Sequence, residues 1–300
     1  MLVRSVLLIL FCLVCIATPT EAVTAGWDTP MRAGLAALKE TDYAKAEYFF
    51  TIALKIAEDA NPNSIEVAVS LNNLAAVYQE EGKYDLVEKL CKRSLGLSEV
   101  LLGPDSIPFA KTLKNLSLLY TKLDRLKEAE SHAERSLSII EKVQGSDGLD
   151  VSASLSALAV IRQVQGRFDS AALLFSRALS IDERLLGHEH QTVGIDLNNL
   201  AEVYTEIGKY KEAEQLFARA ISIDDKVLSQ DSLERAKTLN NLAKLYTVLS
   251  KYSEAEKLYD RSLPVMEKKL GAHHIDVAIV LNNLALLYDL QAVSYTHLRC

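Results

Sequence analysis

The chain has 300 residues, of which 49% are hydrophobic and 24% charged, so it is too apolar for a disordered chain. Its 40 Asp and Glu outnumber its 33 Lys and Arg, which gives a net charge of −7. A mildly acidic chain without a long basic run lacks the charge pattern of a nucleic-acid-binding protein. We therefore expect no nucleic acid among its partners.

Residues 1–25 have the layout of a secretory signal peptide. A short positive start precedes an apolar run at residues 5–17, which is too short to span a bilayer comfortably. Small residues offer cleavage points after Ala22 and Ala25. We expect an exported protein, periplasmic or secreted. The alternative is an uncleaved N-terminal anchor, and only that alternative implies contact with a membrane.

A leucine recurs every 42 residues through the rest of the chain, at Leu74, Leu116, Leu158, Leu200, Leu242 and Leu284. Most copies stand in the sequence Leu-Asn-Asn-Leu-Ala. A fixed period of this length is typical of solenoids, in which each unit buries its apolar face against its neighbours.

One unit, residues 191–232, predicts two helices and a tight turn. Apolar side chains recur at spacings of three and four over Val193–Tyr204, which indicates one face of a helix. Gly208 ends this helix by supplying a positive φ, and a second apolar stripe covers residues 210–228. Because neither helix can bury its apolar face alone, each hairpin must stack on the next.

Cysteine usage gives no disulfide framework. Cys12 and Cys15 lie in the signal segment and Cys300 is terminal, which leaves Cys91 inside the repeats. It stands where other units have Phe, Tyr or Ala, so we predict a small core residue. Stability must then come from helix packing.

The motifs Leu-Ala-x-x-Tyr, Gly-Lys-Tyr and Glu-Ala-Glu resemble the tetratricopeptide repeat, and they are clearest at residues 209–214. The 42-residue unit with Leu-Asn-Asn-Leu-Ala-x-x-Tyr resembles the kinesin-light-chain and nephrocystin-like subtype. A weaker first unit fits one residue out of phase. The resemblance implies an all-α, right-handed superhelical solenoid with about six and a half repeats over residues 30–291. It also implies a scaffold for protein–protein interaction.

By this resemblance, the first helix of each hairpin lines a concave groove that holds a peptide or a helix. The residues expected to contact it are Asn72, Asn73, Lys111, Lys114, Asn115, Lys122, Asn198, Asn199, Glu202, Lys237, Asn240, Asn241 and Lys244.

The asparagine pairs have two interpretations. A primary amide can donate to and accept from a peptide backbone, which favours binding. An asparagine present in nearly every unit can instead bond the neighbouring helix. We favour the structural role for the asparagine next to the repeating leucine, and leave its neighbour open.

The lysines vary between units and are better candidates for specificity. Lys111, Lys114 and Lys122 lie at helical spacing, beside a small apolar floor of Ala153 and Val160. One hypothesis is that they take an acidic peptide with a small apolar side chain. The alternative is a solvated helix face.

Two histidine clusters, at residues 188–190 and 273–274, lie in equivalent loops. They are too far apart to share an ion, and one cluster alone supplies two ligands at most. We predict that they cap the following helices, and we expect neither a metal nor a cofactor.

Repeat four departs from the pattern, with Ser156-Ala157 in place of Asn-Asn and Arg162 in place of Tyr, so its groove surface should differ. Residues 292–300 depart again, since they replace the expected Gly-Lys-Tyr turn. This tail resembles translated adapter sequence, and we expect the natural protein to continue past Gln291.

Catalytic patterns are not found: the sequence has no phosphate loop, no His-Glu-x-x-His and no Gly-x-Ser-x-Gly. The Glu-Ala-Glu carboxylates are expected on exposed faces. Asn115-Leu116-Ser117 forms a glycosylation acceptor within a helix, which favours bacterial export. We therefore expect a non-enzymatic scaffold without a small-molecule substrate. The alternatives are an interaction arm of a larger protein, possibly with a caspase-like peptidase domain, and self-assembly through the uncapped end.

Overall fold

The computed structural model describes the backbone of residues 21–297 and the side chains of residues 26–292. This part of the chain forms thirteen helices and no strand. Their bounds are α1 Glu21–Lys39, α2 Tyr43–Ala60, α3 Ile65–Glu80, α4 Tyr84–Leu102, α5 Ile107–Lys122, α6 Leu126–Gln144, α7 Leu149–Val164, α8 Phe168–Leu186, α9 Gln191–Glu206, α10 Tyr210–Val227, α11 Leu233–Val248, α12 Tyr252–Leu270 and α13 Ile275–His297. Residues 1–20 of the predicted signal peptide lie outside the described residues, and its role stays a prediction.

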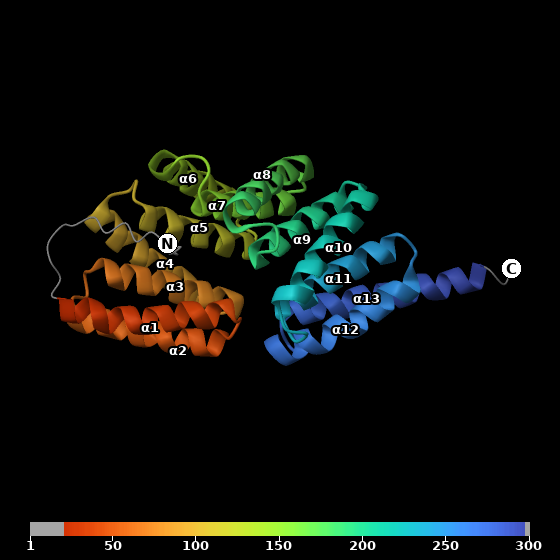
Figure 1. Ribbon diagram of the computed structural model, residues 1–300, viewed down its shortest axis with the longest axis horizontal. Helices are drawn as coiled ribbons and strands as arrows, with labels where there is room; N and C mark the ends of the chain where they lie inside the picture. The colour runs from red at the N-terminus through yellow and green to blue at the C-terminus, as the bar shows by residue number, and fades with distance from the viewer. Residues whose placement is uncertain (1–20, 298–300) are drawn as a thin grey trace, which may run out of the picture.

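Consecutive helices pair into six antiparallel hairpins, followed by α13 as the first helix of a seventh unit (Figure 1). The predicted unit is confirmed, since α9 and α10 begin at the expected residues and end within about one residue of expectation. The all-α superhelical solenoid is confirmed as well.

The turn within each hairpin requires one residue with positive φ. Gly208 has φ of 77°, as predicted, and Gly82 and Gly166 each have 73° at the same position. Asp124 and Ser250 hold φ of 58° and 59° there, although a Cβ disfavours this conformation. The turn is therefore set by its place in the hairpin, and glycine only makes it easier to form.

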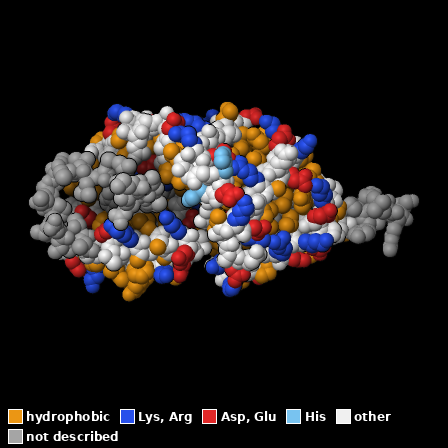
Figure 2. All heavy atoms as spheres, in the orientation of Figure 1, with side chains coloured by type: hydrophobic (Ala, Val, Ile, Leu, Met, Phe, Trp, Pro, Cys, Tyr) orange, Lys and Arg blue, Asp and Glu red, His pale blue; other side chains and the backbone are white. Residues whose placement is uncertain are grey.

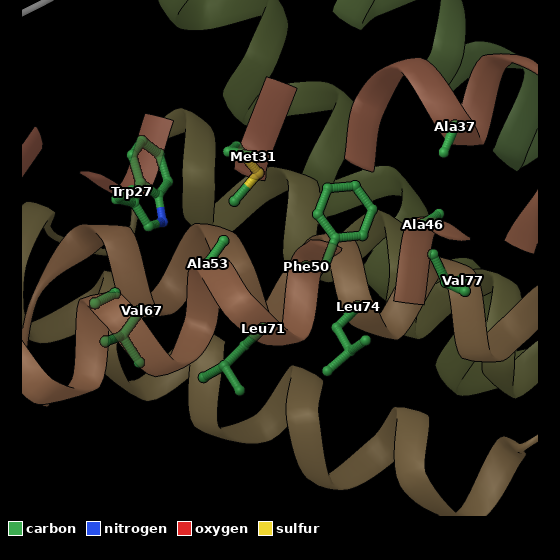
Figure 3. Close-up of a cluster of buried hydrophobic side chains, with 11 residues drawn as sticks. Trp27, Met31, Ala37, Ala46, Phe50, Ala53, Val67, Leu71, Leu74 and Val77 are labelled. Atoms are coloured by element: carbon green, nitrogen blue, oxygen red, sulfur yellow. The ribbon is translucent and has the colours of Figure 1, made fainter. Parts of the chain in front are cut away.

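Each hairpin is packed through large residues that fill the space opposite small ones. Figure 3 shows the first cluster, in which Trp27 and Met31 of α1 face Phe50 of α2 and Leu71 of α3. A Cβ on Gly34 would lie 2.5 Å from the Phe50 ring, so only glycine admits this close approach. Cys91 is fully buried in the next cluster, as predicted, and burial raises the pKa of its thiol to about 12.

Successive repeats are also joined by a recurring polar contact. Between repeats one and two, Tyr78 donates a 2.9 Å hydrogen bond to Glu47, and the Lys83 ammonium lies 4.7 Å from the Tyr78 ring and 3.0 Å from Glu47. Glu88, Glu214 and Glu256 are bonded by the tyrosine of the following repeat in the same way. The expectation of merely exposed Glu-Ala-Glu carboxylates was therefore wrong for the second glutamate, which ties one hairpin to the next.

Repeat four makes this contact with arginine in place of tyrosine. Arg162 pairs with Glu130, and also with Glu134 at 2.7 Å, so the predicted departure of this repeat extends to its packing.

The superhelix curls until its two ends face each other. The turn between α1 and α2 and the end of α12 line a common cavity of about 510 Å³, and Tyr43 packs against the core formed by α11, α12 and α13. In Figure 1, α2 and α12 accordingly approach each other at the lower edge.

The last helix differs from the other first helices in length. α13 has 23 residues against 16 in α11, because it continues through residue 292 where a turn was expected. Its segment Ile275–Ala292 is long and apolar enough to cross a membrane by length and composition alone, with mean hydropathy 1.3. Repeat register also accounts for these residues, since Leu281 and Leu287 match the buried Leu239 and Leu245 of α11.

Candidate binding groove

A concave cavity of about 520 Å³ lies inside the curl of the superhelix. First helices supply most of its wall. We call it the central groove, and its lining residues are Gln79, Glu80, Tyr84, Lys122, Val160, Ile195, Asn198, Asn199, Glu202, Glu234, Lys237, Asn240, Asn241, Met266, His274, Ile275, Asp276 and Ile279.

The structure brings seven of the thirteen candidates into this groove: Lys122, Asn198, Asn199, Glu202, Lys237, Asn240 and Asn241. The other six do not line it: Asn72, Asn73, Lys111, Lys114, Asn115 and Lys244. Val160 of the predicted apolar floor lies in the groove, whereas Ala153 lies outside it.

Several asparagines next to the repeating leucine bond the preceding repeat. Asn115 Nδ2 donates to Asn72 Oδ1 at 2.9 Å, and Asn241 Nδ2 donates to Asn198 Oδ1 at 3.2 Å. The structural role expected for this position is thus observed at both joints. Asn198 accepts this bond and also lines the groove, so its amide N–H groups face a different task from those of Asn241.

The α5 lysines differ in how well their charges are compensated. Lys111 forms a 2.8 Å ion pair with Asp150, whereas no described carboxylate lies within 4.0 Å of the Lys114 or Lys122 ammonium. Burial and the adjacent Lys111 lower the pKa of Lys114. The surface of α5 therefore disfavours additional positive charge.

The opposite wall of the groove is acidic. Glu80, Glu202, Glu234 and Asp276 line it together with Lys237, which pairs with Glu234 at 3.2 Å. Burial opposes the charge on Lys237, but Glu234 and Glu80 outweigh that effect and its pKa is raised. This wall therefore stabilises a cation.

The histidines act as helix caps, as predicted. His190 Nδ1 accepts from the Thr192 N–H at 3.2 Å, and His274 Nδ1 accepts from the Asp276 N–H at 3.1 Å. Within the described residues, no group of three or more His, Cys, Asp or Glu is arranged to hold a metal ion.

Sequence reasoning missed two kinds of groove residue. Ile195 and Ile279 stand five residues before the repeating leucine, as Lys237 does, so the repeat register could have found them. Glu80 and Tyr84 enter the groove only because the superhelix curls back on itself. No local pattern gives the pitch that brings them there.

A model of the tetratricopeptide repeat matches residues 29–99, 66–142, 108–184, 150–226 and 234–292. These matches cover most of the chain, which therefore belongs to the tetratricopeptide repeat family. A search of the curated proteins finds no match.

Solved structures agree on the fold. A Rap protein complexed with Competence and Sporulation Factor has a TM-score of 0.62 and 17% identity, covering 89% of this chain and 76% of that one. BtubC (BKLC) from P. vanneervenii has a TM-score of 0.56 and 20% identity, covering 85% and 94%. A putative kinesin light chain from Podosopora anserina has a TM-score of 0.53 and 23% identity, covering 66% and 94%.

Proposed function

We propose that this protein is a non-enzymatic scaffold that holds a peptide or helix of a protein partner in the central groove. The observation that carries this proposal is the composition of the groove wall. Asn198, Asn199 and Asn240 offer amide groups for a peptide backbone, and Val160 and Ile195 offer apolar contact beside them.

Two further facts support a binding role. Tetratricopeptide repeats typically mediate protein–protein interaction, and the Rap protein of similar fold was crystallised with a partner factor. Export to the periplasm or the cell exterior belongs to the proposal and rests on residues 1–25 alone. An interaction arm of a larger protein would use the same groove.

The test is selection of peptides from a random display library on the immobilised chain. Selected peptides should lose at least tenfold in affinity for Asn198→Ala combined with Asn240→Ala, because the groove amides are removed. Lys127→Glu on the outer helix α6 is the matched control and should leave affinity unchanged. Peptides that bind the groove variant and the parent chain equally would refute the proposal.

A further inference from the structure

We propose that the central groove selects a peptide with ordered charge, with acidic residues against α5 and a basic residue against the opposite wall. This inference rests on the proposed function and adds the chemistry of the partner. We call Lys111, Lys114 and Lys122 the α5 strip, and Glu80, Glu202, Glu234 and Asp276 the acidic wall.

The uncompensated charges of the two surfaces have opposite sign. On the α5 strip, Lys114 and Lys122 have no described carboxylate within 4.0 Å. On the acidic wall, neither Glu80 nor Glu202 has a described cationic group within that distance. Such charges on a concave surface gain most from a partner of complementary pattern. A peptide of one charge sign would satisfy one surface and be repelled by the other.

Two lysines report the local field independently of this pairing. Burial acts against the charge of both Lys114 and Lys237. The pKa of Lys114 is lowered, with Lys111 adding to burial, while the pKa of Lys237 is raised because Glu234 and Glu80 surround it. The field therefore disfavours a cation beside α5 and favours one beside α11.

The acidic wall has capacity for a second cation. Its four carboxylates face only Lys237 on that wall and Lys122 from α5 among the lysines that line the groove. Lys237 remains half-buried, and its printed ion pair uses Glu234 alone. Glu202 and Glu80 remain available to a basic side chain from a partner.

Groove residues contributed by helices between the two surfaces are less charged. Val160 lies on α7 and Ile195 on α9, and Asn198 follows one helical turn later. Small apolar residues between the acidic and basic ends of a peptide would fit this section, with their backbone bonded by the amide.

Three fluorescent peptides of identical composition test the order of charge on the full chain. Each has four Asp, two Ala and four Lys, with blocked termini and no net charge. One begins with the Asp block, one begins with the Lys block, and one alternates Asp and Lys. We expect one block peptide to bind roughly tenfold more tightly than the alternating peptide at low salt.

A charge exchange identifies the residues responsible. Lys114→Glu combined with Glu202→Lys should transfer the preference to the other block peptide, while Lys127→Glu on α6 should not. The neutral pair Lys114→Gln and Glu202→Gln should reduce the preference, and circular dichroism should confirm that each variant folds.

Equal binding of the three peptides, binding of none, or a preference unmoved by the exchange would overturn the charge-order inference. Groove-dependent binding of library-selected peptides would still uphold the proposed function, so the two failures are distinguishable.

Discussion

The joint between repeats four and five uses the same positions as the joint between repeats five and six, but with different chemistry. In the second joint, Glu214 accepts hydrogen bonds from Tyr246 and from Lys251, the latter at 2.9 Å. In the first, Ala172 stands in place of that glutamate and faces Tyr204. The first joint therefore lacks the polar contact that recurs elsewhere.

The first joint instead buries two acids against each other. Asp182 and Asp196 are each 3% exposed, whereas the position of Asp196 holds Thr238 in the next repeat. Ser152 donates to Asp182 at 2.6 Å, and the nearby Glu183 is paired with Arg219 at 2.5 Å. No lysine or arginine is bonded to either aspartate among the described residues. The pair is accommodated by holding a proton.

This comparison shows that one solenoid can contain joints with opposite responses to pH. Burial, followed by the hydrogen bond and charge of Asp182, raises the pKa of Asp196 from 3.8 to about 8. Because the folded chain holds this proton more tightly than the unfolded chain, the associated stability is fully present below about pH 4. It is lost as the pH rises through about 8.

The largest effect is expected from Asp196→Ser, which installs a hydroxyl like those of the other joints. The parent chain should lose up to about 1.4 kcal/mol of stability per pH unit between about pH 4 and pH 8 from this group. The variant should lose that slope and be more stable than the parent at pH 8 by a few kcal/mol. Thermal unfolding at a series of pH values measures both.

Asp147→Ser is the matched control, because this aspartate is exposed in a loop of repeat three and its loss should leave the slope unchanged. A parent slope that persists in Asp196→Ser would rule out the acid pair as its source. Amide hydrogen exchange in α8 and α9, compared between parent and variant at equal pH, localises the effect to this joint.

A smaller effect is expected from removing one tyrosine hydroxyl in each joint. Tyr246→Phe should cost about 1 kcal/mol, because Glu214 loses a hydrogen bond that is half-buried. Tyr204→Phe should be nearly neutral, because its hydroxyl has no described hydrogen-bond partner and Ala172 occupies the glutamate position.

Denaturant unfolding of the two variants tests this difference, and each serves as control for the other. Equal costs would mean that the hydroxyl contributes through solvation and not through the glutamate.

Much of this fold follows from the sequence because the repeat period fixes it. The 42-residue spacing predicts hairpins, turns and the inward-facing leucines, since each depends on contacts within a unit or with the adjacent unit. The pairing of Asp182 with Asp196 was also within reach, because both positions have known register. It was missed because the repeats were compared for the residues they share and not for those that differ.

The groove was less predictable. The register identifies which helices face inward, but the curl of the superhelix decides which inward residues enclose a cavity. Small rotations at every joint add up before Glu80 meets Lys237. For that reason Lys111 and Lys114 satisfy the register rule and still lie outside the groove.

The smallest effect is expected at the hairpin turns, where the repeats on either side of the second joint also differ. Ser250 adopts φ of 59°, while Gly208 adopts 77° in the preceding repeat. Ser250→Gly relieves a strained conformation of roughly 1 kcal/mol, and part of that gain is cancelled by the greater freedom of glycine in the unfolded chain. We expect a net stabilisation of about 0.5 kcal/mol. Gly208→Ser, its mirror, should destabilise by a similar amount, since no atom lies within 4 Å of an added Cβ and only backbone strain acts there. Changes of the same sign in the two variants would show that hydrogen bonding by the Ser250 side chain, and not backbone strain, controls this turn.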